Sequence, residues 1–486
     1  MTWLKSRPDW QLLGVLTLML IAFKAWLTAA AGFELHYDEA QYWEWSQHLD
    51  WSYYSKGPLV AWLIALAEYL FGHGEWQVRL FAWLTHSIFL VLIFVLTRQV
   101  WDSRSAAWWA TSITLTTPLY FTLGLVMTTD VFLFTFWTWG LWAACRALIQ
   151  EQPRAWYELG AAVGIGALAK LSIGLLPAAI GLLTLIIPQY RRHLLRPHVW
   201  AGLGLMLICM SPLLLWNYHH DWVMFRHELG HVGQDEWSWI RLIEFLLGQW
   251  AALSPLVAIL AIAVLAHYPH MLQQRFIWII SLLCLGFFLI KAGGAKVQLN
   301  WPAPVYIGFV VLFAGAIPSF TDAQRRWLLS GIFISLALMA VAYFPHYFGL
   351  PAKLDPFKVV KIWRQPINAI STMTPKADFI LSDKYELAGE LAFYWPQGLP
   401  VYITGSAARR LNQHDLWPAI DREAGRDAIF ISTKPNPPAE LTQAFRQCVT
   451  PQTLAVHAYD GSVLRTLYVT PCSDYVSIIW PKPQFY

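Results

Sequence analysis

Two adjacent carboxylates, Asp38 and Glu39, follow the first long apolar segment of the chain and lie among aromatic residues. Carboxylates beside a membrane are costly unless they are exposed, paired or functional. Neighbouring residues on a helix point about 100° apart, so only one of the two would face a given pocket. We predict that Asp38 is a catalytic base and that Glu39 shapes its charge or binds the acceptor. The competing interpretation is a solvated interfacial helix within a belt of Trp and Tyr.

Cationic residues recur in short polar segments further along the chain. The candidates for binding a phosphate group are Lys56, Lys170, Arg226, Lys291 and Lys296. Such side chains would hold a phosphate leaving group and stabilise the charge that develops on it. For Lys56 the alternative is a side chain that lies along the membrane interface and keeps only its ammonium in water.

The remaining polar and aromatic candidates would position the reacting groups or bind the substrate. Asp130 begins an apolar segment, where it would either complement a helix N-terminus or position the reacting groups. Tyr37, Tyr42, Tyr54 and Asn300 are candidates for substrate binding. A carboxylate base, phosphate-binding cations and an aromatic rim fit the transfer of a sugar from a lipid-linked phosphate to an acceptor hydroxyl, whose proton the base would take. This reaction requires no cofactor, and a divalent metal is an open alternative.

A second motif competes for the assignment. The segment His227-Glu228-Leu-Gly230-His231 matches the HExxH pattern, in which two histidines one turn apart bind zinc and the glutamate activates water. Gly230 weakens the helix that this arrangement needs by about 1 kcal/mol relative to alanine. Three interpretations stay open: a membrane-embedded zinc metalloprotease, a metal or substrate role for these residues in another enzyme, and coincidence.

The elements that must position these residues are those of a membrane protein. Of 486 residues, 57% are hydrophobic and only 13% are Asp, Glu, Lys or Arg, whereas a soluble domain has about 25% charged residues. A span needs about 20 mostly apolar residues. We predict about eleven spans, at roughly 10–31, 76–97, 105–124, 130–149, 156–169, 172–187, 198–217, 240–266, 276–292, 301–318 and 327–345, with a short interfacial helix at 59–71. This composition excludes a cytosolic enzyme, and the net charge of +4 without a long basic run gives no indication of nucleic-acid binding.

The distribution of charge predicts the orientation. Upstream of residue 352, the N-terminus and alternate connections carry 12 of the 20 Lys and Arg residues, and the opposite side carries 13 of the 18 acids. Cytoplasmic segments are enriched in Lys and Arg, so we predict a cytoplasmic N-terminus. An odd number of spans then places the C-terminal part on the outer side of the membrane.

The C-terminal part has the composition of a soluble domain. Residues 352–486 hold 26 of the 64 charged residues. Strands are predicted at 378–381, 401–404, 428–432 and 454–458, and helices at 385–395 and 438–448. We therefore predict a transmembrane domain over 1–351, with a catalytic first loop over 32–75, and a small α/β domain over 352–486. Cys448 and Cys472 could pair there in an oxidising compartment.

Several motifs, spread over nearly the whole chain, carry a resemblance. They are His-Tyr-Asp38-Glu39-Ala-Gln-Tyr-Trp, Tyr-Ser-Lys56-Gly-Pro-Leu, Pro-Leu-Leu-Leu-Trp-Asn217, Asn300-Trp-Pro and Ala388-Gly-Glu-Leu-Ala-Phe-Tyr394. Together they resemble the bacterial relatives of the protein O-mannosyltransferases and the lipid A aminoarabinose transferases, which are membrane glycosyltransferases of the GT-C fold.

This resemblance implies an inverting transferase with a sugar donor linked to undecaprenyl phosphate and an acceptor at the outer face of the inner membrane. It assigns the essential carboxylate to Asp38, the second family aspartate to Asp130 and the lysine before proline to Lys56. Some lipid A transferases carry Glu-Lys-Pro-Pro where this chain has Ser55-Lys56-Gly57-Pro58. The sugar therefore stays open between a hexose, a hexuronic acid and an amino sugar. The acceptor stays open between lipid A, core oligosaccharide, O-antigen, another glycan and protein.

Overall fold

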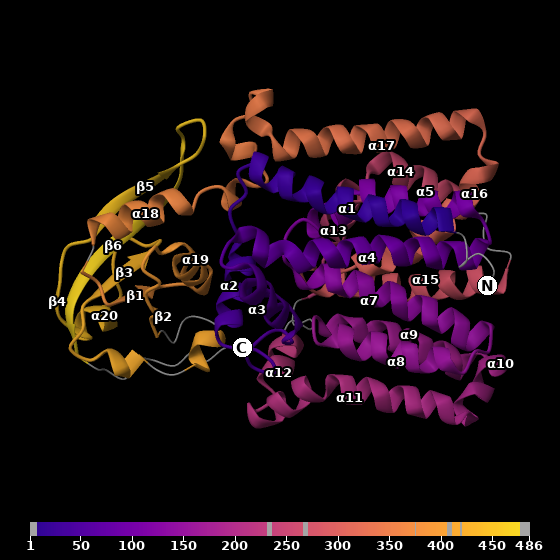
Figure 1. Cartoon of the computed structure of the whole chain (residues 1–486), viewed down its shortest axis with the longest axis horizontal. Helices are drawn as coiled ribbons and strands as arrows, with labels where there is room; N and C mark the ends of the chain where they lie inside the picture. The colour runs from indigo at the N-terminus through magenta and orange to yellow at the C-terminus, as the bar shows by residue number, and fades with distance from the viewer. Residues whose placement is uncertain are drawn as a thin grey trace.

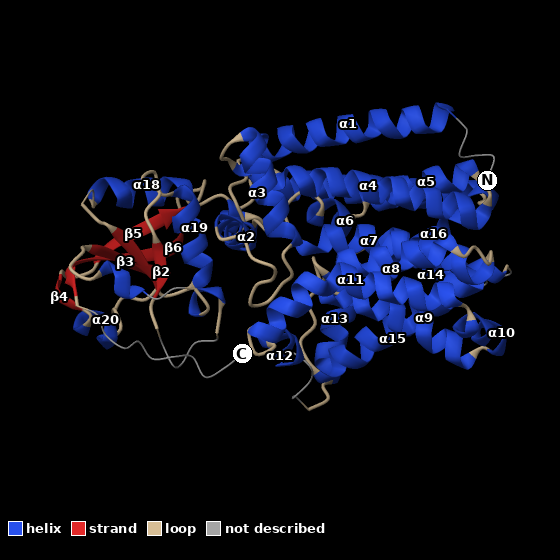
Figure 2. Cartoon of the chain, turned by 60° about the horizontal axis from the view of Figure 1, so that its bottom comes forward, coloured by secondary structure: helices blue, strands red, loops and turns tan. Residues whose placement is uncertain are grey.

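The computed structural model is a bundle of apolar helices with a small sheet-containing domain at one end (Figure 1). It describes residues 7–230, 236–265, 271–374, 376–405, 411–417 and 420–476. Most of the long helices run roughly parallel, and α1 begins at the end of the bundle away from the domain. Every strand of the described residues lies in the domain (Figure 2).

Six of the described helices are long and apolar enough to cross a membrane, or up to eight spans if each of two bent pairs counts as one. The six are α1 (Arg7–Ala30), α4 (Glu75–Trp101), α7 (Thr129–Ala144) with the π-helical turn Cys145–Ile149, α11 (Pro197–His219), α15 (Leu272–Gly294) and α17 (Asp322–Tyr343). The predicted polytopic membrane fold is confirmed.

Each of the eleven predicted segments corresponds to a helix or a helix pair, but five are shorter or broken. The short helices are α8 (Arg154–Ala167), α9 (Leu175–Ile186), which is followed by the turn α10 (Pro188–Arg191), and α16 (Ala303–Ala316). The segment 105–124 divides into α5 (Arg104–Thr116) and α6 (Pro118–Leu123). The segment 240–266, predicted as one span, is a pair bent by 103°, α13 (Trp239–Ala252) and α14 (Pro255–Leu265). A proline begins the second helix of both pairs, because proline disfavours helical conformation in the residue before it.

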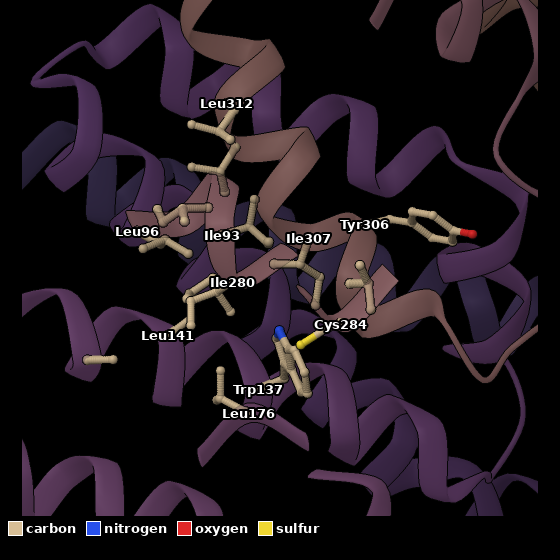
Figure 3. Packing of buried hydrophobic residues seen from close by; sticks show 14 of the residues in the cluster. Ile93, Leu96, Trp137, Leu141, Leu176, Ile280, Cys284, Tyr306, Ile307 and Leu312 are labelled. Carbon is tan, nitrogen blue, oxygen red and sulfur yellow. The ribbon is translucent and has the colours of Figure 1, made fainter. Parts of the chain in front are cut away.

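Apolar side chains from helices distant in sequence form the core of the bundle. Figure 3 shows Ile93 of α4, Trp137 of α7 and Ile280 of α15 within this cluster. Small residues allow close helix packing elsewhere: a Cβ on Gly160 of α8 would lie 2.0 Å from the carbonyl oxygen of Gly202 in α11. Close backbone approach is the usual means of packing helices in lipid, where the hydrophobic effect does not drive them together.

Two short helices, α2 (Tyr37–Gln47) and α3 (Leu59–Phe71), lie between the bundle and the domain (Figure 1). At 13 residues, α3 is too short to span a bilayer, in agreement with its prediction as an interfacial helix. Helix α19 (Tyr385–Tyr394) of the domain packs on α2. A Cβ on Gly389 would lie 3.0 Å from the backbone nitrogen of Gln41, so a glycine allows the two helices to touch.

The domain has a six-stranded mixed sheet. Its strands are β1 (Phe379–Ser382), β2 (Val401–Ile403), β3 (Ala428–Ser432), β4 (Phe445–Cys448), β5 (Gln452–His457) and β6 (Val463–Tyr475), and its other helices are α18 (Arg364–Met373) and α20 (Ala439–Gln443). The strand order is β2-β1-β3-β6-β4, and β5 pairs with β6. Strand β1 is parallel to β2 and β3, whereas β6 is antiparallel to β3, β4 and β5. The predicted small α/β domain is confirmed.

The prediction of a helix over 438–448 is wrong in its second half. Helix α20 ends at Gln443, and residues 445–448 form β4, which pairs with the long strand β6 that the sequence did not predict. Cys448 lies opposite Cys472 in this pairing, and the two form the predicted disulfide. Tertiary pairing with a neighbouring strand has overridden local helix propensity.

Candidate active site

The first turn of α2 places Asp38 at the end of the bundle that faces the domain. His36 caps this helix, since its Nδ1 accepts the backbone N–H of Asp38 at 3.2 Å. Glu39 closes a capping box by accepting the backbone N–H of His36 at 3.0 Å. A carboxylate in the first turn is favoured by the helix dipole. The local sequence therefore starts the helix and directs both carboxylates.

Asp38 has an accessible carboxylate. Its side chain is 41% exposed, and its one close polar side-chain contact within the described residues is His36, whose Nδ1 lies 3.6 Å from Oδ2. The protein on the remaining sides desolvates the group and raises the pKa of Asp38, with Asp130 and Glu39 adding to the shift and His36 and Lys56 opposing it. A carboxylate with open lone pairs and a raised pKa is suited to accept a proton.

Glu39 is completely buried and faces the other way. Arg79 donates to it twice, from Nε to Oε1 at 2.8 Å and from Nη2 to Oε2 at 2.7 Å. The backbone N–H groups of Met127 and His36 donate to its two oxygens as well. A carboxylate has about four lone-pair sites, and all are filled here. Glu39 was predicted to shape the charge of Asp38 or to bind the acceptor. Its charge does act on Asp38, and its buried placement is that of a positioning residue that joins α2 to α4 and to the segment before α7.

The sequence did not predict Arg79, the partner of Glu39. A signal was present, because a cation in an apolar segment is costly unless it is paired. Arg79 also donates to the backbone carbonyls of Phe33 and Glu34 at 3.2 and 2.6 Å. It thereby fixes the connection between α1 and α2 as well as Glu39.

Asp130 accepts hydrogen bonds from two other candidate site residues, which come from distant parts of the chain. Lys170, in the loop after α8, donates to its Oδ1 at 2.8 Å. The amide of Asn300, from the loop before α16, donates to its Oδ2 at 2.9 Å. Asp130 itself is only 4% exposed. Because both of its oxygens are engaged, Asp130 is better placed to hold Lys170 than to accept a proton.

Lys56 lies in the loop between α2 and α3 and reaches a helix at the same end of the bundle, α12 (Val223–Gly230). Its Nζ donates to Glu228 Oε1 at 3.0 Å. Burial opposes a charge on Glu228, but Lys56, together with His227 and Lys170, outweighs it and lowers the pKa of this carboxyl. The loop is fixed at its far side by Leu59, whose N–H donates to the Leu168 carbonyl at 3.1 Å.

Replacing Gly57 by alanine is expected to displace this loop. A Cβ at Gly57 would lie 2.2 Å from the carbonyl oxygen of Leu168, a backbone atom that has little freedom to move. Overpacking of this kind costs about 1–3 kcal/mol. The unfolding midpoint of the purified protein in detergent would measure the loss. Gly174→Ala is the matched control, because nothing lies within 4 Å of its Cβ position; equal midpoints for the two variants would contradict the prediction.

The residues of the HExxH motif contact other side chains instead of forming a metal site. His227 Nδ1 lies 3.1 Å from the Tyr54 hydroxyl and Glu228 pairs with Lys56, whereas His231 lies outside the described residues. In the part of the chain that the structure describes, no group of three or more His, Cys, Asp or Glu could hold a metal ion. The metalloprotease interpretation is not supported.

Six charged side chains form a connected group, which we call the Asp38 cluster: Asp38, Lys56, Asp130, Lys170, Glu228 and Lys291. The charges of Lys56 and Asp130 act on Asp38, and those of Lys56 and Lys170 act on Glu228. These residues come from loops or helix ends that are up to about 250 positions apart in sequence. The structure therefore brings the main candidates to one place.

The three remaining cationic candidates differ in their contacts. Lys291 interacts electrostatically with Glu228, and its Nζ lies 4.5 Å from the centroid of the Trp301 ring. Lys296 is exposed in the loop before α16, and Arg226 is exposed on α12. Within the described residues, no contact joins Lys296 to the Asp38 cluster.

The three tyrosine candidates have different positions. Tyr42 is buried near Asp38 and Asp130, and burial raises the pKa of Tyr42 well above its usual value, so it stays a neutral hydroxyl. Tyr54 is buried beside His227. Tyr37 is half-buried, next to His36. Of the three, Tyr37 is the most exposed and therefore the most accessible to a substrate, whereas Tyr42 and Tyr54 are buried.

The domain also contributes to the site, through residues that the sequence did not predict. The short turn Gln413–Asp415 lies against the Lys56 loop, and Gln413 Oε1 accepts the buried backbone N–H of Tyr54 at 2.7 Å. His414 Nε2 lies 3.2 Å from Glu44 Oε2 of α2, with both side chains buried. Nothing in the local sequence marks these residues, because their partners are more than 350 positions away.

Gln413→Ala is expected to loosen the Lys56 loop. The substitution leaves the buried N–H of Tyr54 without its acceptor, which costs about 1–3 kcal/mol. Gln413→Glu keeps an oxygen at the same position and is the matched control. Hydrogen exchange of the Tyr54 amide should accelerate in the alanine variant and return toward the wild-type rate in the glutamate variant. Equal exchange in wild type and Gln413→Ala would show that this contact does not hold the loop.

Comparisons with known proteins agree with this architecture. A family model described as dolichyl-phosphate-mannose-protein mannosyltransferase matches residues 55–216. The chain is 26% identical to the lipid A galacturonosyltransferase RgtD of Rhizobium johnstonii over 355 residues, which cover 69% of this chain and 72% of that protein. It is 25% identical over 385 residues to the undecaprenyl phosphate-alpha-4-amino-4-deoxy-L-arabinose arabinosyl transferase of Pseudomonas aeruginosa, with 68% of each chain covered.

A solved structure shows the same fold. The crystal structure of ArnT from Cupriavidus metallidurans bound to undecaprenyl phosphate superposes with a TM-score of 0.67 at 17% identity, covering 96% of this chain and 98% of that one. The resemblance that the sequence motifs carry is confirmed. This chain is a polytopic membrane protein of the GT-C fold, and it is similar to lipid A glycosyltransferases and, over residues 55–216, to the protein mannosyltransferases.

Proposed function

We propose that this protein transfers a sugar from an undecaprenyl-phosphate-linked donor to a lipid A or lipopolysaccharide acceptor at the periplasmic face of the bacterial inner membrane. The observation that carries the proposal is the Asp38 cluster, in which an accessible carboxylate lies among lysines at the end of the bundle that faces the domain. The names of the relatives in Rhizobium and Pseudomonas support the donor lipid and the acceptor class. The periplasmic location follows from the charge asymmetry of the predicted connections.

The proposed reaction is a single displacement with inversion. Asp38 takes the proton of the acceptor hydroxyl as the new bond forms between that oxygen and the anomeric carbon. The bond between the anomeric carbon and the phosphate oxygen breaks, and undecaprenyl phosphate leaves. Lys56 and Lys170 stabilise the negative charge on the departing phosphate. Asp130 and Glu228 hold these two lysines in place in the resting protein.

A chemical comparison of cell envelopes tests the proposal. In a deletion strain of the source bacterium, mass spectrometry of the glycolipids is expected to show the loss of one sugar-sized mass, which the wild-type gene restores. The mass identifies a hexose, hexuronic acid, pentose or amino sugar directly. Identical glycolipid, glycan and glycoprotein fractions in the deletion and complemented strains would refute the proposed transfer.

The rate of transfer should depend on pH through Asp38. The base acts when it is deprotonated, so kcat/KM falls as pH falls through its pKa. Because the pKa of Asp38 is raised, this fall occurs at higher pH than for an ordinary aspartate, whose pKa is about 3.9. The positive charge of Lys56 limits the rise in the pKa of Asp38. Lys56→Gln should therefore move the fall of kcat/KM at acidic pH to still higher pH. A pH profile of the residual activity measures this, and an unmoved limb would contradict the assignment.

A further inference from the structure

A cavity separate from the Asp38 cluster opens where the bundle meets the domain. Its volume is about 470 Å³. Three parts of the chain line it: residues 30–32 at the end of α1, the connector between α17 and α18 (residues 344–363), and the hairpin between β5 and β6. In Figure 1 this hairpin lies on the same side of the domain as the end of α17.

The connector brings basic side chains to the cavity. His346, Lys358 and Lys361 are among its lining residues. Lys361 is already neutralised, since its Nζ lies 2.9 Å from the Asp355 carboxylate. Within the described residues, Lys358 makes one hydrogen bond, to the backbone carbonyl of Lys353 at 3.0 Å. An ammonium has three donors, so Lys358 keeps both its charge and free donors for a ligand.

The surroundings of the cavity place it at the membrane surface. The spans α1 and α17 both end beside it. Tyr347, Phe348 and Leu354 of the connector are all more than half exposed. Large exposed side chains of this kind mark a contact surface, and aromatic residues at the ends of spans lie at the level of the lipid headgroups. The lysines of the connector are therefore at the depth of the lipid phosphates.

We infer that this cavity binds the phosphate of an anionic phospholipid from the leaflet on the domain side. Lys358 would donate to the phosphate oxygens, which form strong charge-assisted hydrogen bonds with an ammonium. Ala30, Ala31 and Leu464 provide an apolar wall for the adjoining glycerol and upper acyl groups. Because the wall comes from both the bundle and the domain, the bound lipid would contact both parts. This site is independent of the proposed sugar transfer.

Titration of the full-length protein in neutral detergent micelles, followed by native mass spectrometry, tests the inference. Phosphatidylglycerol is the probe, and phosphatidylcholine, which has a phosphate but no net charge, is its control. Lys358→Gln is expected to weaken phosphatidylglycerol binding about tenfold, whereas Lys358→Arg keeps the charge and should stay close to wild type. Lys353→Gln removes the same charge from an exposed neighbour outside the cavity and leaves its backbone carbonyl in place.

The outcome separates a defined site from general attraction to a basic surface. A loss confined to Lys358→Gln, with Lys353→Gln equal to wild type, supports the cavity. An equal loss in both variants, no loss in Lys358→Gln, or equal binding of the two lipids would overturn it. Circular dichroism of each variant checks the fold, and Lys358→Arg shows whether the position tolerates substitution.

Discussion

Asp38→Asn is expected to lower kcat for sugar transfer by about 10²–10⁴-fold, the usual contribution of a general base. Asparagine has the same shape but cannot take the acceptor proton. The effect should fall on kcat and not on the stability of the protein, because the carboxylate accepts no hydrogen bond within the described residues and its side chain is 41% exposed. Turnover of the purified enzyme, with the donor and acceptor identified from the envelope, measures it.

The control for this variant is Asp322→Asn, which makes the same isosteric change at an exposed carboxylate in the first turn of α17. It should turn over at the wild-type rate. Asp130→Asn provides a second comparison, because Asp130 is already engaged with Lys170 and Asn300. If Asp38→Asn protein folds normally and keeps wild-type activity, Asp38 is not the base.

Glu39→Gln is expected to destabilise the protein by about 3–5 kcal/mol, the usual result of breaking a buried ion pair from one side. The variant would leave the Arg79 guanidinium, only 1% exposed, without its charged partner. Unfolding of the purified protein in detergent, titrated with denaturant, measures the change. This loss is larger than that expected for either Gly57→Ala or Gln413→Ala.

A surface pair supplies the matched comparison for Glu39. Arg364, whose side chain is 55% exposed, pairs with Glu75, and Arg364→Gln should cost less than about 1 kcal/mol. Equal losses for Glu39→Gln and Arg364→Gln would show that the buried pair does not hold α2 in place.

The convergence of Asp38, Lys56, Asp130 and Lys170 could be predicted from sequence for a simple reason. Spans alternate in direction, so every second connection lies on the same side of the membrane. The alternation of connections therefore assigned the segments that carry these residues to one end of the bundle. This held although several of the helices are shorter or more bent than predicted. The strands β1, β2, β3 and β5 were predictable in a similar way, from short β-rich runs between turns.

Pairwise contacts between side chains could not be predicted in the same way. The alternation of connections assigns a residue to a side of the membrane, but it does not identify the residue's partner on that side. Lys170 was predicted to hold a phosphate, and in the structure it contacts Asp130. Glu39 was predicted to shape the charge of Asp38 or to bind the acceptor, but its partner Arg79 was not predicted, because the rotation of α2 is set by its packing and not by its own sequence. Strand β4 was missed for the same reason, since its partner β6 supplies the interactions that make it a strand.

The close contact between α2 and α19 has a consequence for domain exchange with relatives. Gly389 touches the backbone of Gln41, so any larger residue at either surface would push the domain away from the first loop. A chimaera that joins this bundle to a relative's domain at the connector would therefore pair two surfaces that were not selected together. The unit that can be transplanted without loss of fit is the domain together with α2, although the two are separated by more than 300 residues of chain.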